Sequence, residues 1–136
     1  MKYNKSNNKK LTNTLIDGNR SQAEEIVINL LRLKFKKLSI LRNDRSVLNK
    51  LEIDIYLPEF KFAIECDGII HFKPIYGQET LDRVQKNDSK KSLLLEQKGI
   101  QLFRIDISKQ TPATLYPYLK NIVNTELIPL IMKWTG

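Results

Sequence analysis

The sequence predicts an α/β protein with a mixed central sheet and a C-terminal helix. Its 136 residues suffice for one domain with a substantial core. Residues 51–57 and 62–67 alternate apolar and polar side chains, as half-buried strands do. Residues 21–38 and 79–98 carry apolar side chains at helical spacing. The expected order is therefore helix, two or three antiparallel strands, helix, strand and helix.

The amino-terminal segment, residues 1–20, is polar and basic. It contains five asparagines and few apolar side chains. This composition predicts a flexible arm, with residues 21–136 forming the single folded domain. The arm is either a solvated end without a role or a segment that binds phosphate groups. Its basic residues are Lys2, Lys5, Lys9, Lys10 and Arg20.

The first helix is predicted to begin at Ser21. Ser21 is a favourable N-cap, and Glu24 follows three residues later, as in a capping box. Residues 40–42 favour a short strand that ends in the polar turn 43–45. The apolar positions that define the helix are Ile26, Val27, Leu30, Leu31, Phe35 and Leu38.

Two alternating segments then predict an antiparallel hairpin. Residues 51–57 form one strand, which Pro58 ends, and residues 62–67 form the next, which Gly68 closes. A connection this short joins neighbouring antiparallel strands. The polar face of the hairpin carries Asp54, Glu65 and Asp67.

The second half of the chain predicts a helix, a strand and a last helix. The helix spans about residues 79–98 and ends at Gly99, a favoured C-cap residue. Residues 100–105 form a strand, and Thr111-Pro112 opens the C-terminal helix. Breaks are expected at Pro117 and Pro129. An apolar stripe along this helix either packs on the sheet of its own chain or forms a homodimer contact; it comprises Leu119, Ile122, Val123, Leu127, Leu130 and Ile131, with Trp134 at its end.

Charge and composition narrow the function classes. The chain has a net charge of +8, which favours a polyanionic partner. No apolar segment is long enough for a membrane helix or a signal peptide, so a soluble intracellular protein without a membrane partner is expected. A single cysteine and a single histidine exclude an internal disulfide and a Cys/His zinc finger.

Acidic residues gather where the hairpin is predicted. Residues 51–82 contain seven acidic and two basic residues. Asp54, Glu65 and Asp67 on adjacent strands converge within a few ångströms, and a divalent cation would relieve their repulsion. Oxygen ligands of this kind favour Mg²⁺ or Mn²⁺ over zinc. The alternative is a solvent-facing strand whose acids keep the sheet soluble.

Two charges interrupt the apolar stripe of the helix predicted at residues 79–98. Leu81, Val84, Asp88, Lys91 and Leu95 share one face of that helix. A charge that faces a sheet needs a partner or a metal. Asp88 and Lys91 either pair with each other at the helix edge or contribute to the acidic site.

Together these residues resemble the PD-(D/E)xK nuclease superfamily. The closest likeness is to its very-short-patch-repair-like branch, which includes phage homing endonucleases of the EDxHD type. The resemblance spans about residues 21–107, and its αβββαβ restriction-endonuclease-like core agrees with the predicted element order. The matching residues are Ser21 and Glu24, LEIDIYLP at 51–58, AIECDG at 63–68, His71-Phe72, Asp88, Lys91, Leu94, Gly99-Ile100 and LFRI at 102–105.

The resemblance implies a metal-dependent site. Asp54 and Glu65 would hold Mg²⁺ or Mn²⁺ with the backbone carbonyl of Cys66, and Glu24 would reach the metal through water. Bound metal would activate a water and neutralise charge on the scissile phosphate. Lys91 would also neutralise phosphate charge.

The same resemblance assigns a proton shuttle. His71 is the natural candidate because its unperturbed pKa lies near neutrality. Asp67 and Asp88 would orient His71 or complete a metal site. Asp67 stands where the superfamily usually has a lysine, so His71 and a helix residue would take over the duties of that lysine.

The resulting expectation is a metal-dependent DNA endonuclease, specifically a homing endonuclease of a mobile element. The alternatives are a mismatch nickase of the very-short-patch-repair type and a catalytically inactive nucleic-acid-binding domain on the same fold. Charge alone would also suit an RNA-binding accessory protein. The expected partners are double-stranded DNA and a second copy of the chain. The expected location is the cytoplasm of a bacterial or phage-infected cell, with an organelle or a nucleus as the alternatives. Besides the basic arm, Arg42 and Arg45 are candidate DNA contacts.

Overall fold

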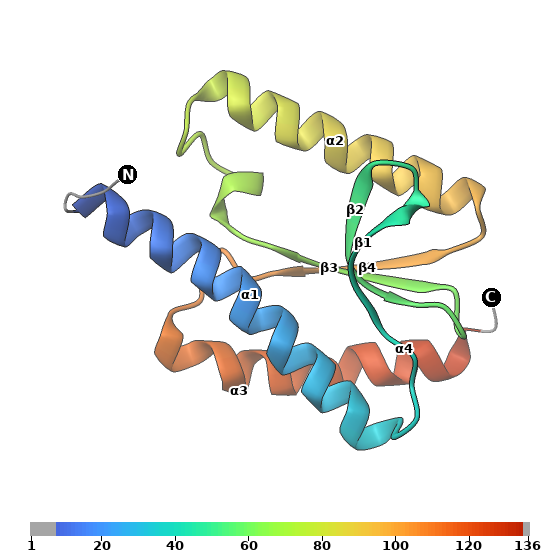
Figure 1. The fold of residues 1–136 in the computed structure, drawn as a ribbon. Helices are drawn as coiled ribbons and strands as arrows, with labels where there is room; N and C mark the ends of the chain where they lie inside the picture. The colour runs from blue at the N-terminus through green and yellow to red at the C-terminus, as the bar shows by residue number, and fades with distance from the viewer. Residues whose placement is uncertain (1–7, 135–136) are drawn as a thin grey trace.

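The computed structural model describes residues 8–134. In it, the protein folds into three layers (Figure 1). A four-stranded sheet forms the middle layer, with α2 (Gln78–Gln97) on one face. The opposite face is covered by α1 (Asn8–Lys34) and α3 (Pro112–Ile122). The α/β class expected from the sequence is confirmed. Within the described residues, no helix is long and apolar enough to cross a membrane.

The sheet is mixed and has the order β1-β2-β3-β4. The predicted hairpin is confirmed: β2 (Leu51–Leu57) pairs antiparallel with β3 (Phe62–Asp67), with Ile55 opposite Ile64. β4 (Gln101–Asp106) lies parallel to β3 and places Arg104 opposite Glu65. Two charged side chains from neighbouring strands therefore share the face covered by α2.

β1 (Leu41–Leu48) is longer than the predicted strand at residues 40–42. The polar residues 43–45 do not form a turn; the β1–β2 register shifts between Asp44 and Leu48, which marks a bulge. The Asp44 carboxylate accepts the backbone N–H groups of Ser46 and Val47 within this irregular stretch. The turn into β2 comes at Asn49-Lys50, where both residues have positive φ.

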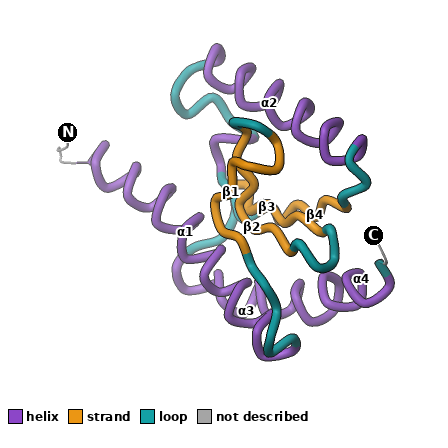
Figure 2. Tube along the Cα trace, turned by 45° about the vertical axis from the view of Figure 1, so that its right-hand side comes forward, coloured by secondary structure: helices purple, strands orange, loops and turns teal. Residues whose placement is uncertain are grey.

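α1 begins at Asn8, so the predicted start at Ser21 is wrong. Ser21 lies within the helix, where its backbone carbonyl accepts a hydrogen bond from Arg42 at 2.9 Å. Figure 2 shows the amino-terminal turns of α1 extending beyond the sheet. The predicted basic arm therefore overlaps α1: the backbone of Lys9 and Lys10 is helical, whereas Lys2 and Lys5 lie outside the described residues.

The remaining helices agree more closely with the sequence. α2 starts at Gln78, one residue before the prediction, and Gly99 follows it with φ of 71°. Thr111 caps α3 through a reciprocal pair with Thr114, and Pro112 lies in its first turn. Pro117 lies inside α3, so the break predicted there is wrong. The regular α-helix changes only later, at the π-helical turn η2 (Val123–Leu127), and Pro129 lies in the first turn of α4 (Ile128–Lys133), close to the break predicted at that residue.

The C-terminal apolar stripe packs inside the chain. Four of its residues are fully buried in the larger core, between the sheet, α1 and the C-terminal helices, while Ile122 and Leu130 are half-buried against that core. The stripe is therefore not an exposed dimer contact, and its interpretation as internal packing is confirmed. The fully buried residues are Leu119, Val123, Leu127 and Ile131.

The two faces of the sheet have different chemistry. The face toward α1 and α3 is apolar and includes Phe62, Ile64 and Cys66 of β3. The face toward α2 has a smaller apolar cluster, with Ala63 and Leu95, at one end. The rest of that face carries charged side chains, so α2 covers a polar site.

Candidate active site

Asp54 and Glu65 form a buried carboxylate pair on adjacent strands. Only 5% of Asp54 and 2% of Glu65 is exposed. One Glu65 oxygen accepts the backbone N–H of Asp54 at 2.8 Å, and one Asp54 oxygen accepts the backbone N–H of Cys66 at 2.9 Å. Burial and the negative charge of Glu65 raise the pKa of Asp54 to about 7. The strand backbone thus holds two mutually repelling carboxylates together.

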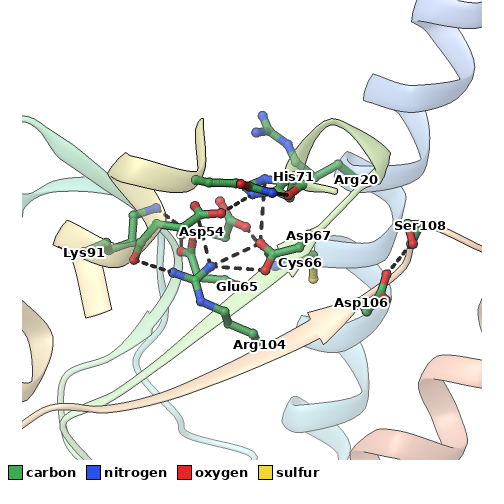
Figure 3. A network of polar contacts seen from close by, with 12 residues as sticks. Arg20, Asp54, Glu65, Cys66, Asp67, His71, Lys91, Arg104, Asp106 and Ser108 are labelled. Carbon is green, nitrogen blue, oxygen red and sulfur yellow. Dashed lines mark hydrogen bonds and ion pairs between the residues drawn. The ribbon is translucent and has the colours of Figure 1, made fainter. Parts of the chain in front are cut away.

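Lys91 supplies a positive charge to this pair from α2. Its ammonium lies 2.7 Å from Oε1 of Glu65, and only 12% of the side chain is exposed. Asp88 and Lys91 do not pair with each other at the helix edge. Lys91 contacts Glu65, and Asp88 hydrogen-bonds His71. Figure 3 shows Lys91 and His71 approaching the carboxylates from different sides. The positive charge of Lys91 on α2 therefore compensates the negative charge of Glu65 on β3.

Glu24 brings a further carboxylate from α1. It is 2% exposed, and Nε of Arg42 donates to its Oε1 at 3.1 Å. Its Oε2 is buried without a hydrogen bond, although Nε of Arg20 lies 3.8 Å away. Burial raises the pKa of Glu24 despite these cations. The negative charge of Glu24 also raises the pKa of Asp54, so the two carboxylates belong to one electrostatic cluster.

His71 ends the short 3-10 turn η1 (Ile69–His71) directly after β3. Its Nδ1 lies 2.8 Å from Oδ2 of Asp88 on α2, and its Nε2 lies 3.7 Å from Oδ1 of Asp67. Burial alone lowers the pKa of His71, but the Asp88 hydrogen bond and the charges of both aspartates outweigh it and raise the pKa. The pKa of Asp88 is lowered because its bond to His71 outweighs the effect of burial. Asp88 is therefore the close partner of His71, and Asp67 lies farther from the ring.

Arg104 is a site residue that the sequence reasoning did not assign. From β4, its Nη1 reaches Oδ2 of Asp67 at 3.1 Å. Its Nη2 donates to the backbone carbonyl of Asp88 at 3.1 Å. Periodicity alone does not pair residues 101–106 with β3; the parallel register, which puts Arg104 opposite Glu65, brings this side chain to the acids.

The other predicted site residues lie apart from this cluster or are engaged elsewhere. The guanidinium of Arg42 joins β1 to α1 through Glu24, Glu25 and Ser21, so it serves an internal contact. Arg45 is exposed and lies 3.5 Å from Glu52 at the β1–β2 hairpin. Their binding to DNA, like that of Arg20 and the amino-terminal lysines, stays a prediction.

The donor chemistry of the buried pair fits a hard divalent cation. Mg²⁺ is commonly held by one or two carboxylates together with substrate phosphate oxygens. Asp54 and Glu65 supply two such carboxylates, and the backbone carbonyl of Cys66 stays a predicted third ligand. The Cys66 thiol itself is buried, and burial raises its pKa well above the usual value. No group of three acidic, histidine or cysteine side chains among residues 8–134 forms a ready metal cage.

Comparisons with protein-family models, curated proteins and solved structures found no match to this chain. The functional interpretation therefore depends on the arrangement of the site and on the motif resemblance.

Proposed function

We propose that this chain is a metal-dependent endonuclease that hydrolyses phosphodiester bonds in double-stranded DNA. The observation that carries the proposal is the buried Asp54–Glu65 pair of the sheet under α2, together with the Asp88–His71 pair that joins α2 to the turn η1 after β3. Two repelling carboxylates beside a histidine and two cations are costly to fold. Such an arrangement is typical of catalytic sites, where perturbed pKa values gather.

The charge distribution supports a nucleic acid substrate. The chain carries +8 overall although its candidate site is acidic. Arg83, Lys86 and Lys90 are exposed on α2 at helical spacing, so they follow one line on the helix that covers the site. Since Asp88 and Lys91 face the sheet, this basic line lies on the outer side of α2, where it would attract phosphate groups to the helix that covers the site.

Asp54 and Glu65 are the residues that would hold Mg²⁺ or Mn²⁺. When bound, such an ion lowers the pKa of a coordinated water and neutralises charge on the phosphate. Lys91 and Arg104 add positive charge around the buried acids. Asp88 accepts the Nδ1 proton of His71 and so directs Nε2 toward proton exchange. Neutral Nε2 would accept a proton from the attacking water, and the imidazolium would then release it to solvent, from which the leaving oxygen takes its own proton.

The primary test is cleavage of a plasmid library carrying genomic inserts, with Mg²⁺, Mn²⁺ or EDTA, followed by mapping of the new ends. Wild type should cut with either metal and not in EDTA. Asp54→Asn and Glu65→Gln should each abolish cleavage and keep or strengthen DNA binding, because they remove negative charge near phosphate. Asp82→Asn is a matched control, since Asp82 is exposed on α2 and accepts a hydrogen bond from Gln78. Cleavage by both site variants at the wild-type rate would overturn the proposed metal pair.

The role of His71 has its own test. His71→Ala should lower the cleavage rate by about 10²- to 10⁴-fold, the usual contribution of general acid–base catalysis. DNA binding should stay close to wild type because the side chain is only 15% exposed. A lower melting temperature with normal specific activity would make His71 a structural residue.

The substrates distinguish the biological roles within this proposal. We propose a homing endonuclease of a mobile element, which should cut one long, fully paired site and leave related sequences intact. A mismatch nickase should instead cut one strand of a mismatched duplex and ignore its paired counterpart. Parallel assays on paired and mismatched copies of the mapped site separate the two roles.

A further inference from the structure

Asp67 and Asp88 are shared unequally between His71 and Arg104. His71 lies close to Asp88, with 2.8 Å between Nδ1 and Oδ2, and farther from Asp67, with 3.7 Å between Nε2 and Oδ1. Arg104 shows the reverse preference, because its Nη1 lies 3.1 Å from Asp67 and 3.8 Å from the Asp88 carboxylate. Each aspartate therefore has one close cationic partner.

The guanidinium of Arg104 is also fixed on its other side. Its Nη2 donates to the backbone carbonyl of Asp88 at 3.1 Å and lies 3.4 Å from the hydroxyl of Ser92. These contacts join β4 to α2 and hold the planar guanidinium in one orientation. Asp67 is consequently paired with an arginine that is itself hydrogen-bonded to α2, and Figure 3 shows the contacts that join Arg104 to the Asp67 carboxylate.

The long separation at Nε2 has a chemical consequence. A distance of 3.7 Å exceeds hydrogen-bond range, so Asp67 does not occupy the Nε2 position. Nδ1 is engaged by Asp88, which leaves Nε2 as the ring nitrogen available for proton exchange. If Asp67 moved closer by less than an ångström, it would accept a hydrogen bond from the Nε2–H of the imidazolium and close that position.

We propose that Arg104 is a positioning residue that holds the Asp67 carboxylate away from Nε2 of His71. Without Arg104, His71 is the remaining cationic partner among the contacts that the described residues make to the Asp67 side chain. The buried carboxylate, only 5% exposed, then turns to the imidazole, because an unpaired buried charge is costly. Nε2 becomes hydrogen-bonded on the protein side and is lost to the substrate.

The inference rests on the proposed function only for its effect on cleavage, because the position of Asp67 can be tested without DNA or metal. His71 is the single histidine of the chain, so its ¹⁵N and ¹H ring signals can be assigned directly. The charged groups facing it are Asp67 from β3, Asp88 from α2 and Arg104 from β4. Titration by NMR reports both the pKa of the ring and which nitrogen carries the proton.

Arg104→Gln should raise the pKa of His71 by about one unit, because a nearby cation is replaced by a close carboxylate. The Nε2 signal should change to that of a hydrogen-bonded proton, and cleavage should fall by at least tenfold with its pH profile shifted to alkaline values. Arg104→Lys keeps the positive charge but cannot contact Asp67 and the Asp88 carbonyl with two separate nitrogens, so the pKa of His71 should rise by an intermediate amount. Arg32→Gln, an exposed arginine near the end of α1, is the matched control and should leave the His71 signals unchanged.

The double variant Asp67→Asn/Arg104→Gln separates positioning from simple charge loss. Asparagine does not stabilise the imidazolium as a carboxylate does, so the His71 pKa should return to the wild-type value or below.

An unchanged His71 pKa and unchanged Nε2 signal in Arg104→Gln would overturn the proposal. If that variant does not fold, Arg104→Lys and the double variant decide: an Arg104→Lys titration identical to wild type rejects the positioning role. Wild-type cleavage failure with the expected titrations would reject the nuclease proposal alone.

Discussion

The Lys91 ammonium lies 2.7 Å from the Glu65 carboxylate, so α2 places one cation against the buried acidic pair of the sheet. The effect reaches Asp54, because the charge of Lys91 lowers the pKa that burial and Glu65 raise. The residue two positions after Glu65 on β3 is Asp67, so the cation beside Glu65 comes from α2 and not from the strand itself.

Replacing this lysine should destabilise the protein and make it more responsive to divalent cations. Lys91→Met leaves Glu65 buried without the ammonium, and breaking a buried pair costs about 3 kcal/mol of unfolding free energy. Mg²⁺ should recover part of this loss, because it no longer competes with Lys91 for Glu65. The measurement is the melting temperature in EDTA and over a Mg²⁺ series.

Lys90→Met is the matched control for that experiment. Lys90 is the preceding residue of α2 and is exposed, so its replacement should leave both the melting temperature and the Mg²⁺ response unchanged. An identical Mg²⁺ response in wild type and Lys91→Met would contradict competition between Lys91 and the ion at Glu65.

The raised pKa of Asp54 predicts a pH-dependent stability. The folded protein binds a proton at Asp54 up to about pH 7, whereas an unperturbed aspartate has a pKa of 3.8. The unfolded state therefore binds fewer protons between these values, and the contribution of Asp54 to stability falls as pH rises through this range. Asp54→Asn cannot titrate, so it removes this pH-dependent loss of stability. Its side-chain oxygen can still accept the N–H of Cys66. In EDTA, its stability advantage over wild type should grow from about pH 4 to about pH 7 and level off above.

Asp82→Asn tests whether that trend is specific. Its carboxylate is exposed on α2, so the difference from wild type should stay small at every pH. Chemical denaturation at several pH values measures both variants. A wild-type stability that rises steadily relative to Asp54→Asn over the same pH range would reject the buried, protonated state of Asp54.

Local patterns are enough to predict the hairpin and its acids. Strict alternation fixes which face a strand residue occupies, so the spacing of Asp54 and Glu65 alone places them on one face of neighbouring strands. Helical spacing does the same for Asp88 and Lys91, whose position in an apolar stripe signals a polar site under α2. Their particular partners depend on how the helix crosses the sheet, which periodicity does not encode.

The errors arise where a local signal has two possible contexts. Ser21 with Glu24 satisfies the capping-box pattern, but Ser21 lies inside a longer helix and contacts Arg42 from β1. Asn43 suggests a turn, yet its positive φ belongs to the irregular strand β1. Arg104 escapes local reasoning because its role comes from the β3–β4 register, which brings it to Asp67 from far along the chain.

The helical start of α1 sharpens the prediction for the basic segment. Lys9 and Lys10 lie on its first turns, so Lys9→Gln/Lys10→Gln preserves a helix-favouring side chain while removing two charges. Each lost phosphate contact should lower the slope of log affinity against log salt by about 0.9. The double variant should thus lower it by up to about 1.8 and leave the mapped cleavage site unchanged. A changed site would show that the segment reads bases, and an unchanged slope would exclude these lysines from the interface.

The last prediction concerns how one set of site residues cuts two strands. Each chain holds one Asp54–Glu65 pair and one His71, so a double-strand break requires two chains or two successive nicks. Because the C-terminal stripe is buried within the chain, the proposed homodimer must form through another surface and is expected on DNA. Light scattering should then detect a larger species only with a duplex containing the mapped site. Linear plasmid should appear with a rate that rises as the square of protein concentration.

A control duplex with that site scrambled should leave the protein monomeric. Nicked plasmid that never becomes linear, with a monomer in both states, would reject the homodimer and favour a repair-type nickase.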